Sequence, residues 1–310
     1  MIKDFAIQTQ ELTKQYANVR ALDEVSLAIP HGAICALIGR NGAGKTTAIR
    51  TLLGMVHATS GSGQVLGLSI DDARASVQIR RRVAFVDPTA IYPWMTVGQV
   101  LRLVRGCYAD WNRSREIAGI FALDLPLARK VSELSKGMRT KLAVLISLAR
   151  DAEVLFFDEP TDGLDPVVRE QVIRSLIAIN AQREATLVVS SHQLGELEDV
   201  ANWLCLLDRG RLVLSGEMEQ VRGSHHRFDV RWDGDASPLL GAVPGVLSVT
   251  RNGMFGTMIV VGNIHGEIVA AGASIVKQQP ASLKEIVLAY GAPDRGNADW
   301  VTLGMRDAVA

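Results

Sequence analysis

The chain has 310 residues, of which 48% are hydrophobic and 21% are charged. This is an ordinary globular composition and excludes a largely disordered chain. The 33 lysines and arginines balance the 33 aspartates and glutamates, so the broad positive charge of a typical nucleic-acid-binding protein is absent and no nucleic-acid partner is expected. Three widely spaced cysteines without a Cys-x-x-Cys pair argue against a disulfide scaffold or a zinc site, and for a reducing compartment.

The N-terminus lacks the apolar run of a secretory signal peptide. The longest apolar stretches, at 143–149 and 154–157, are much shorter than the roughly 18 residues that suggest a transmembrane helix. We therefore expect a cytosolic chain that does not cross a bilayer but can dock onto a protein that does.

The first part of the chain, through about Leu37, alternates apolar and polar residues in short runs that predict antiparallel strands. A turn at residues 30–32 ends this region. The continuous apolar run Ala33–Ile38 then predicts a strand buried on both faces. A glycine-rich loop comes next, and a helical pattern begins at Lys45 and continues to about Leu53. Strand, loop and helix in this order form the unit that binds phosphate groups in many nucleotide-binding proteins.

Helical periodicity covers residues 97–125 and 136–150, which indicates a helical subdomain, about 88–150, inserted into the domain. Strands and helices then alternate, as strand 154–157, helix 168–179, strand 186–190 and a helix after Ser191. This alternation predicts a mostly parallel sheet with helices on both faces. Together these elements predict an α/β domain that spans residues 1–222.

The composition changes after Glu219, and residues 223–226 have the character of a linker. We expect residues 223–310 to form a small α+β accessory domain with a strand at Met258–Val261 and a serine-capped helix at Ser282–Tyr290. No chemical motif is visible in it. The tail from about residue 291 is polar.

The strongest motif fits G-x-x-x-x-G-K-[ST]. Its glycines let backbone N–H groups face phosphate oxygens, and the helix after the loop adds its positive N-terminal end. Lys45 supplies a charge for the β- and γ-phosphates, and the hydroxyl of Thr46 is a ligand for Mg²⁺. The sequence thus predicts an ATP-binding loop made of Gly39, Asn41, Gly42, Ala43, Gly44, Lys45, Thr46 and Thr47.

A second motif places two carboxylates at the end of the apolar strand 154–157. Taken alone, such a pair is often only a strand end that meets solvent. After a phosphate loop in an α/β pattern, however, Asp158 is expected to hold Mg²⁺ through its water shell. Glu159 is expected to polarise the attacking water, because phosphoryl transfer depends mainly on positioning and charge neutralisation.

From Tyr16 to His192 the chain resembles the nucleotide-binding subunits of ATP-binding cassette (ABC) transporters. Besides the two motifs above, residues 134–138 read Leu-Ser-Lys-Gly-Met, similar to the family signature Leu-Ser-Gly-Gly-Gln. Lys136 replaces the first glycine and Met138 replaces the glutamine. This form is found in a bacterial branch of the family whose cassettes are often exporter-like. The resemblance implies a P-loop ATPase core with an N-terminal antiparallel β subdomain.

The resemblance also implies roles for single residues. Ser135 and the backbone of Gly137, at the start of a helix, would contact the γ-phosphate held by the opposite subunit. Tyr16 would stack on adenine, although an ordinary strand aromatic is the alternative. Asp165 lies in the loop that meets its twin across the dimer, and His192 would hydrogen-bond the γ-phosphate. With Lys45 and Glu159, His192 completes the predicted catalytic set.

One position departs from the family. Where other members have a glutamine that touches Mg²⁺, this chain reads Val-Asp-Pro-Thr-Ala at 86–90. Asp87 is the nearest candidate, because a carboxylate can serve Mg²⁺ as an amide oxygen does. A turn aspartate before proline is the alternative.

In the family, each ATP lies between the phosphate loop of one chain and the signature of another. Since this chain carries both, a homodimer with two competent sites is the simplest prediction, and a heterodimer with a sibling cassette is the second. The leading hypothesis is an ATPase that drives an ABC transporter of the exporter type, with separate transmembrane subunits. Such a subunit would lie at the cytoplasmic face of the membrane.

Two other functional classes remain as alternatives. A soluble ABC ATPase that acts on ribosomes or DNA usually has two cassettes in one chain or long coiled-coil insertions, and neither is visible here. A small-molecule kinase would not need the segment at Ser135. The sequence does not name the transported substrate.

Overall fold

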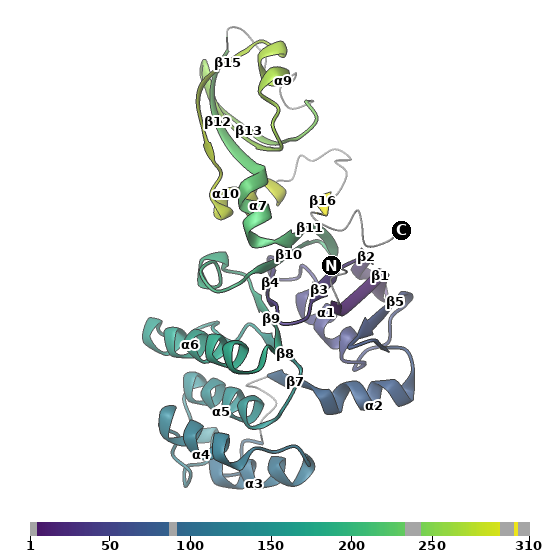
Figure 1. Ribbon diagram of the computed structural model, residues 1–310, viewed down its shortest axis with the longest axis vertical. Helices are drawn as coiled ribbons and strands as arrows, with labels where there is room; N and C mark the ends of the chain where they lie inside the picture. The colour runs from purple at the N-terminus through teal and green to yellow at the C-terminus, as the bar shows by residue number, and fades with distance from the viewer. Residues whose placement is uncertain (1–4, 87–91, 233–242, 292–300, 303–310) are drawn as a thin grey trace. The chain divides into compact units, whose positions relative to one another are not determined.

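The structure is a computed structural model that describes residues 5–86, 92–232, 243–291 and 301–302 (Figure 1). Within these ranges no helix combines the length and hydropathy that a membrane crossing requires. The chain divides into two compact units, Met1–Leu212 and Val213–Ala310. Cys35, Cys107 and Cys205 form no disulfide bond.

The N-terminal residues of the first unit form an antiparallel sheet, as predicted. Its strand order is β2-β1-β5-β6, and β3 pairs with β1. The strands β5 and β6, which come after the phosphate-binding helix, were not expected from the sequence. The five strands are β1 (Phe5–Tyr16), β2 (Val19–Val25), β3 (Ala28–Pro30), β5 (Ser60–Val65) and β6 (Leu68–Ser69).

The second sheet of this unit contains the predicted parallel strands. Five of its seven strands run in the order β10 (Trp203–Asp208), β4 (Ile34–Ile38), β9 (Thr186–Ser191), β8 (Val154–Asp158) and β7 (Val83–Val86). Of these, β7 and β10 were not expected from the sequence. Every residue of β4 and β9 is buried, which accounts for their continuous apolar runs. Because parallel strands end at the same edge, the segments that come after β4, β8 and β9 meet there.

Six helices accompany these sheets in the described part of the first unit: α1 (Lys45–Leu52), α2 (Ala73–Arg82), α3 (Val97–Cys107), α4 (Arg113–Ala122), α5 (Lys136–Ala149) and α6 (Pro166–Arg183). The inserted helices α3 to α5 group together in Figure 1 and share an apolar cluster of their own. The prediction of a helix after Ser191 is wrong. The chain forms only a short 3₁₀ turn there, at Leu194–Glu196.

Arg150 connects the end of α5 to the rest of the unit. Its guanidinium lies 3.7 Å from the centre of the Tyr108 ring and donates to the carbonyl oxygens of Arg80 and Arg81, at 3.2 and 3.0 Å. These carbonyls belong to the last turn of α2, where a cation satisfies the free acceptors. The C-terminal end of α5 is thereby fixed to α2.

The second unit begins inside the strand β11 (Arg211–Glu217), earlier than the expected boundary after residue 222. The prediction of a linker at residues 223–226 is wrong. These residues are the end of helix α7 (Met218–Ser224) and the start of strand β12 (His225–Trp232). The segment looked polar, but its residue His225 is fully buried.

The main sheet of the second unit is antiparallel, in the order β13-β14-β12-β15, with β13 (Val246–Asn252), β14 (Phe255–Val261) and β15 (Ala273–Pro280). One face packs on helix α9 (His265–Ala270) through the apolar cluster of Phe228, Val230, Trp232, Met258, Val260 and Ile268. The expected strand at 258–261 lies within β14, and the expected helix is α10 (Leu283–Tyr290), capped by Ser282. The expected polar tail lies outside the described residues, except Val301–Thr302, which form β16 and pair with β11.

Candidate functional site

The phosphate loop joins the end of β4 to the start of α1, at the edge where the parallel strands end. Gly42 and Gly44 have φ angles of 82° and 105°, in the region that favours glycine. At Gly39 a Cβ atom would lie 2.5 Å from the carbonyl oxygen of Leu207, so no side chain fits there. The motif glycines are therefore required by the path of the backbone.

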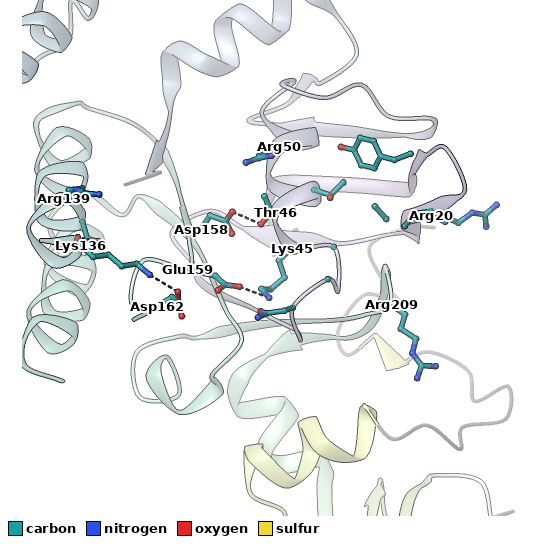
Figure 2. Close-up of a pocket in the computed structure, with 18 residues that line it drawn as sticks. Arg20, Lys45, Thr46, Arg50, Lys136, Arg139, Asp158, Glu159, Asp162 and Arg209 are labelled. Atoms are coloured by element: carbon teal, nitrogen blue, oxygen red, sulfur yellow. Dashed lines mark hydrogen bonds and ion pairs between the residues drawn. The ribbon is translucent and has the colours of Figure 1, made fainter. Parts of the chain in front are cut away.

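Lys45 is the buried cation of this loop. Its side chain is 4% exposed, and its ammonium donates to the carbonyl oxygens of Gly39 and Arg40 at 2.7 and 3.3 Å. The same ammonium lies 3.1 Å from a carboxylate oxygen of Glu159, and Figure 2 shows the two side chains pointing toward each other. These partners compensate for the cost of burying the charge.

Asp158 and Thr46 are joined directly. The Thr46 hydroxyl donates to Asp158 Oδ2 at 2.7 Å (Figure 2). A hydroxyl and a carboxylate are oxygen ligands of the type that Mg²⁺ prefers, so this pair fits the predicted metal role. The third predicted metal ligand, Asp87, lies outside the described residues.

Ser190 was not singled out by the sequence analysis, yet it supports both acids. Its hydroxyl donates to Asp158 Oδ1 at 2.7 Å and accepts from the backbone N–H of Glu159 at 2.9 Å. The cause is strand register, because Asp158 in β8 stands opposite Ser190 in the neighbouring strand β9. The available signal was a pair of serines, 190 and 191, at the end of a buried strand just before His192.

Glu159 adopts a backbone conformation that is rare for residues other than glycine, with φ of 47°. Such conformations cost free energy and gather at functional sites. The carboxylate lies between two partners, Lys45 at 3.1 Å and Nδ1 of His192 at 3.2 Å. The other ring nitrogen of His192, Nε2, is 3.2 Å from the side-chain amide nitrogen of Gln193. The structure thus brings the three predicted catalytic residues together.

A cavity of about 1080 Å³ opens beside these residues, which is large enough for a nucleotide. Asn41, Gly42, Gly44, Lys45, Thr46 and Thr47 line it together with Asp158 and Glu159. Tyr16, the predicted adenine-stacking residue, also lines the cavity, is 45% exposed, and has the Lys14 ammonium 4.8 Å from its ring centre. Ala43 is buried within the loop.

The signature segment starts helix α5. The Ser135 side chain caps the helix by accepting a hydrogen bond from the backbone N–H of Met138 at 3.2 Å. Ser135 is exposed to solvent. Lys136, Arg139 and Thr140 line the cavity, but Ser135 and Gly137 do not. Within one chain, the structure therefore does not bring the signature serine to the phosphate loop.

The loop between β8 and α6 contains the last predicted site residue. Asp165 caps α6 by accepting from the backbone N–H groups of Val167 and Val168, both at 3.1 Å. Earlier in the loop, Asp162 accepts from the ammonium of Lys136 at 2.9 Å. This hydrogen bond holds the pKa of the Asp162 carboxyl below its usual value, with a further contribution from the charge of Lys136 and that of His192.

Comparison with known proteins places these features in a family. Residues 22–162 match the family described as ABC transporter. The bacitracin transport ATP-binding protein BcrA of Bacillus licheniformis is 31% identical over 225 residues, which cover 72% of this chain and 73% of that protein. An uncharacterised ABC transporter ATP-binding protein of Synechocystis is 31% identical over 250 residues, which cover 76% and 69%.

Two further matches are weaker, one because it covers only part of the other protein and one because its sequence identity is lower. The probable multidrug ABC transporter ATP-binding protein YbhF of Escherichia coli is 31% identical over 225 residues, but the match covers only 38% of that protein. Among solved structures, a dimeric ATP-binding cassette in a post-hydrolysis state, bound to ADP and Pi, has a TM-score of 0.62 at 22% identity and covers 68% of this chain and 98% of its own. Likeness at this identity shows the shared fold.

Proposed function

This chain belongs to the ABC transporter ATP-binding proteins, which are ATPases, and on that premise we propose that it is the motor subunit of an exporter. It binds MgATP between two copies of itself and passes the resulting motion to separate transmembrane subunits at the cytoplasmic face of the membrane. The observation that carries the proposal is the contact of Glu159 with both Lys45 and His192, beside the Thr46–Asp158 pair and at the wall of the cavity.

The residues divide the work as their contacts suggest. The amides of the phosphate loop and the ammonium of Lys45 bind the β- and γ-phosphates. Thr46 and Asp158 would hold Mg²⁺, which would neutralise charge on the phosphate oxygens. Glu159 orients the attacking water and accepts its proton, and His192 holds Glu159 in place and reaches the γ-phosphate. Ser190 fixes both acids.

The opposite face of the nucleotide is left to a second chain. Ser135 is exposed at the N-terminal end of α5, and its helix presents a positive dipole end. A second copy would bring Ser135 and the Gly137 amide to the γ-phosphate, and Asp165 to its twin. A homodimer is the simplest arrangement because this chain carries both halves of the site, and a heterodimer with a sibling cassette is the second.

The transmembrane partner rests on two supports. Similar proteins are named for bacitracin and multidrug transport. In addition, Tyr92 and Trp94 are 46% and 67% exposed, and their ring centres are 5.4 Å apart. Exposed aromatic pairs of this kind are typical of protein contacts. We assign this pair to the transmembrane subunit.

Asp87 is proposed as the residue that takes the place of the family's Mg²⁺-contacting glutamine. Asp87→Ala is then expected to weaken the Mg²⁺ dependence of ATP hydrolysis, or to uncouple hydrolysis from the transmembrane partner. Measuring ATP hydrolysis across a Mg²⁺ titration, with and without that partner, tests both effects. Wild-type kinetics in both assays would remove Asp87 from this role.

The proposal is tested with Glu159→Gln, which keeps the shape of the side chain but removes its basicity. We expect turnover to fall roughly 100-fold or more while MgATP binding persists. A pull-down of the trapped complex from detergent-solubilised membranes then identifies the partner. Recovery of a multi-span membrane protein supports the motor assignment. Recovery of ribosomes or DNA instead would replace it with a soluble ABC ATPase.

A further inference from the structure

Lys136 stands where the family signature carries a glycine, and it makes contacts that a glycine cannot. It is the first residue of α5. Its side chain is 54% exposed, and its ammonium donates to Asp162 Oδ2 at 2.9 Å. Figure 2 shows the lysine extended from α5 toward this aspartate in the loop after β8. The pair links residues 26 positions apart.

The same side chain also fits closely against Gly163. This glycine has φ of 63°, and a Cβ atom there would lie 3.0 Å from the Lys136 ammonium and 3.7 Å from its Cδ. The lysine therefore lies along backbone that carries no side chain. The contact involves the same ammonium as the ion pair and the methylene chain behind it, and both bring Lys136 to the loop of residues 161–165.

Gly137 adds a third contact at the same place. A Cβ atom at Gly137 would lie 2.9 Å from Val168 Cγ1 and 3.7 Å from Leu164 Cδ2. The first turn of α5 thus packs directly against the end of the loop and the start of α6. Two consecutive signature residues, 136 and 137, contact residues 162–168.

The loop in turn reaches the chemistry. Asp162, Glu159 and His192 each offer an oxygen or nitrogen atom within 4.8 Å of the others. Without Lys136, Asp162 would lose its hydrogen-bonded cation and lie as a second carboxylate near Glu159. A displacement of the loop would therefore change the surroundings of Glu159, the residue that orients the attacking water.

We propose that Lys136 is a positioning residue: its pair with Asp162 fastens the loop 161–165 to the signature helix, so that Ser135 and Asp165 are presented to a second copy as one rigid element. The inference rests on the proposed function, in which both residues act across the dimer. In this chain the fastening takes the place of the flexibility that a glycine would give.

A competing role for Lys136 gives a different pattern of results. The lysine could instead contact a phosphate of the partner's nucleotide, since it lines the cavity. In that case Asp162 would be dispensable, whereas fastening requires both members of the pair. The variants needed are Lys136→Gln, Asp162→Asn, the double variant, and the exchanged pair Lys136→Asp with Asp162→Lys.

The first measurement is amide hydrogen exchange on the full-length, nucleotide-free protein. The reporter is the Leu164 amide, which donates to the Thr161 carbonyl at 3.2 Å. Each single variant is expected to raise its exchange roughly 1.5- to 5-fold, the range for losing one exposed ion pair. The exchanged pair is expected to restore the wild-type rate. Unchanged exchange in the single variants would overturn the proposal.

The matched control is Arg174→Gln, which breaks an exposed ion pair of 2.6 Å with Glu170 on α6. It removes the same charge from the neighbouring helix without touching the loop. We expect wild-type exchange at Leu164 in this control. Acceleration there equal to that of Lys136→Gln would mean that loss of any surface charge loosens the loop, and would also overturn the proposal.

The second measurement is ATP-driven dimerisation in the Glu159→Gln background. Two fastenings act per dimer, so each single variant is expected to lower the dimer association constant at saturating ATP roughly 2- to 30-fold. The double variant should be no worse than either single one, and the exchanged pair should recover. Weakening by Lys136→Gln alone, with Asp162→Asn unaffected, would establish a direct phosphate contact and overturn the fastening.

The two measurements separate the two proposals. If Glu159→Gln itself forms no dimer with ATP, the composite site of the proposed function fails, while hydrogen exchange at Leu164 still decides whether Lys136 fastens the loop. If the dimer forms but neither exchange nor dimerisation responds to the four variants, the fastening alone fails.

Discussion

On the phosphate-loop side of the site, Lys45 is 4% exposed and has two carbonyl oxygens and a carboxylate as partners. Asp158 accepts hydrogen bonds at both carboxylate oxygens. On the signature side, Ser135 is exposed and its hydroxyl is used to cap its own helix. The first half is assembled within one chain. The second half presents its groups outward, as a surface that a second molecule completes.

The difference has an energetic basis. A buried charge such as Lys45 must be compensated in the absence of ligand, because an unpaired one costs several kcal/mol. An exposed helix N-terminus carries no such cost, because water satisfies its amides. The phosphate-loop side can therefore be preorganised in a single chain, whereas the signature side gains its partner only on closure.

The largest effect is expected from Lys45→Ala, which removes the centre of the preorganised half. Wild-type protein should gain about 2.7 kcal/mol of stability at an ATP concentration 100 times Kd, and the variant should gain almost none. Thermal unfolding with and without MgATP measures this, with the exposed Lys284→Ala as the control. A wild-type shift in the Lys45 variant would remove Lys45 from the phosphate site.

A smaller effect is expected from Ser190→Ala, which loses the hydrogen bonds to Asp158 and to the Glu159 amide. Each such bond is worth about 1–3 kcal/mol when a buried partner is left behind, so turnover should fall roughly 10- to 100-fold. The control is Ser147→Ala, because the buried Ser147 hydroxyl donates only to Ala143 within its own helix at 3.1 Å. Equal losses in steady-state ATPase assays of both variants would point to general destabilisation.

The smallest effect concerns the helical subdomain that carries the signature. Glu116 is 3% exposed. Its carboxylate accepts one hydrogen bond from the Arg113 guanidinium and another, at 2.6 Å, from the indole N–H of Trp111. Burial raises the pKa of this carboxyl, but hydrogen bonds from Arg113 and Trp111 outweigh that effect and hold the pKa below its usual 4.5. Its stabilisation is thus complete above that pH and is lost as the pH falls toward the lowered value.

Glu116→Gln should accordingly cost about 1–2 kcal/mol in the free energy of unfolding at neutral pH, and progressively less in acid. Urea unfolding at about pH 7 and about pH 4, each compared with the wild type, measures the difference. A penalty that stays constant or grows as the pH is lowered would contradict the charged pairing. The exposed Glu170→Gln serves as the control.

Local order in the sequence explains which parts of the site were predictable. The loop from Gly39 to Thr47 and the pair Asp158–Glu159 could be predicted directly from strand, loop and helix in succession, and in the structure Lys45, Asp158 and Glu159 line one cavity. Ser190 was missed because its role depends on which strand lies beside β8. The Lys136–Asp162 pair likewise depends on packing between segments that are distant in the chain.

The second unit shows the same limit for the fold. The serine cap of α10 and the strand around Met258 are local features and were predicted. The start of the unit was misplaced because His225 looks like a linker residue but is buried, with a ring nitrogen 3.2 Å from the Tyr290 hydroxyl. Gly256 is explained by packing alone, since a Cβ atom there would overlap the Trp232 ring.

The most direct test of the outward-facing signature is Ser135→Asp in the Glu159→Gln background, followed by sedimentation velocity with MgATP. Aspartate caps a helix as well as serine does, so α5 stays intact while a negative charge faces the partner's γ-phosphate. We predict that Glu159→Gln alone sediments as a dimer and that adding Ser135→Asp leaves a monomer still protected by ATP. A dimer undiminished by Ser135→Asp would contradict the account.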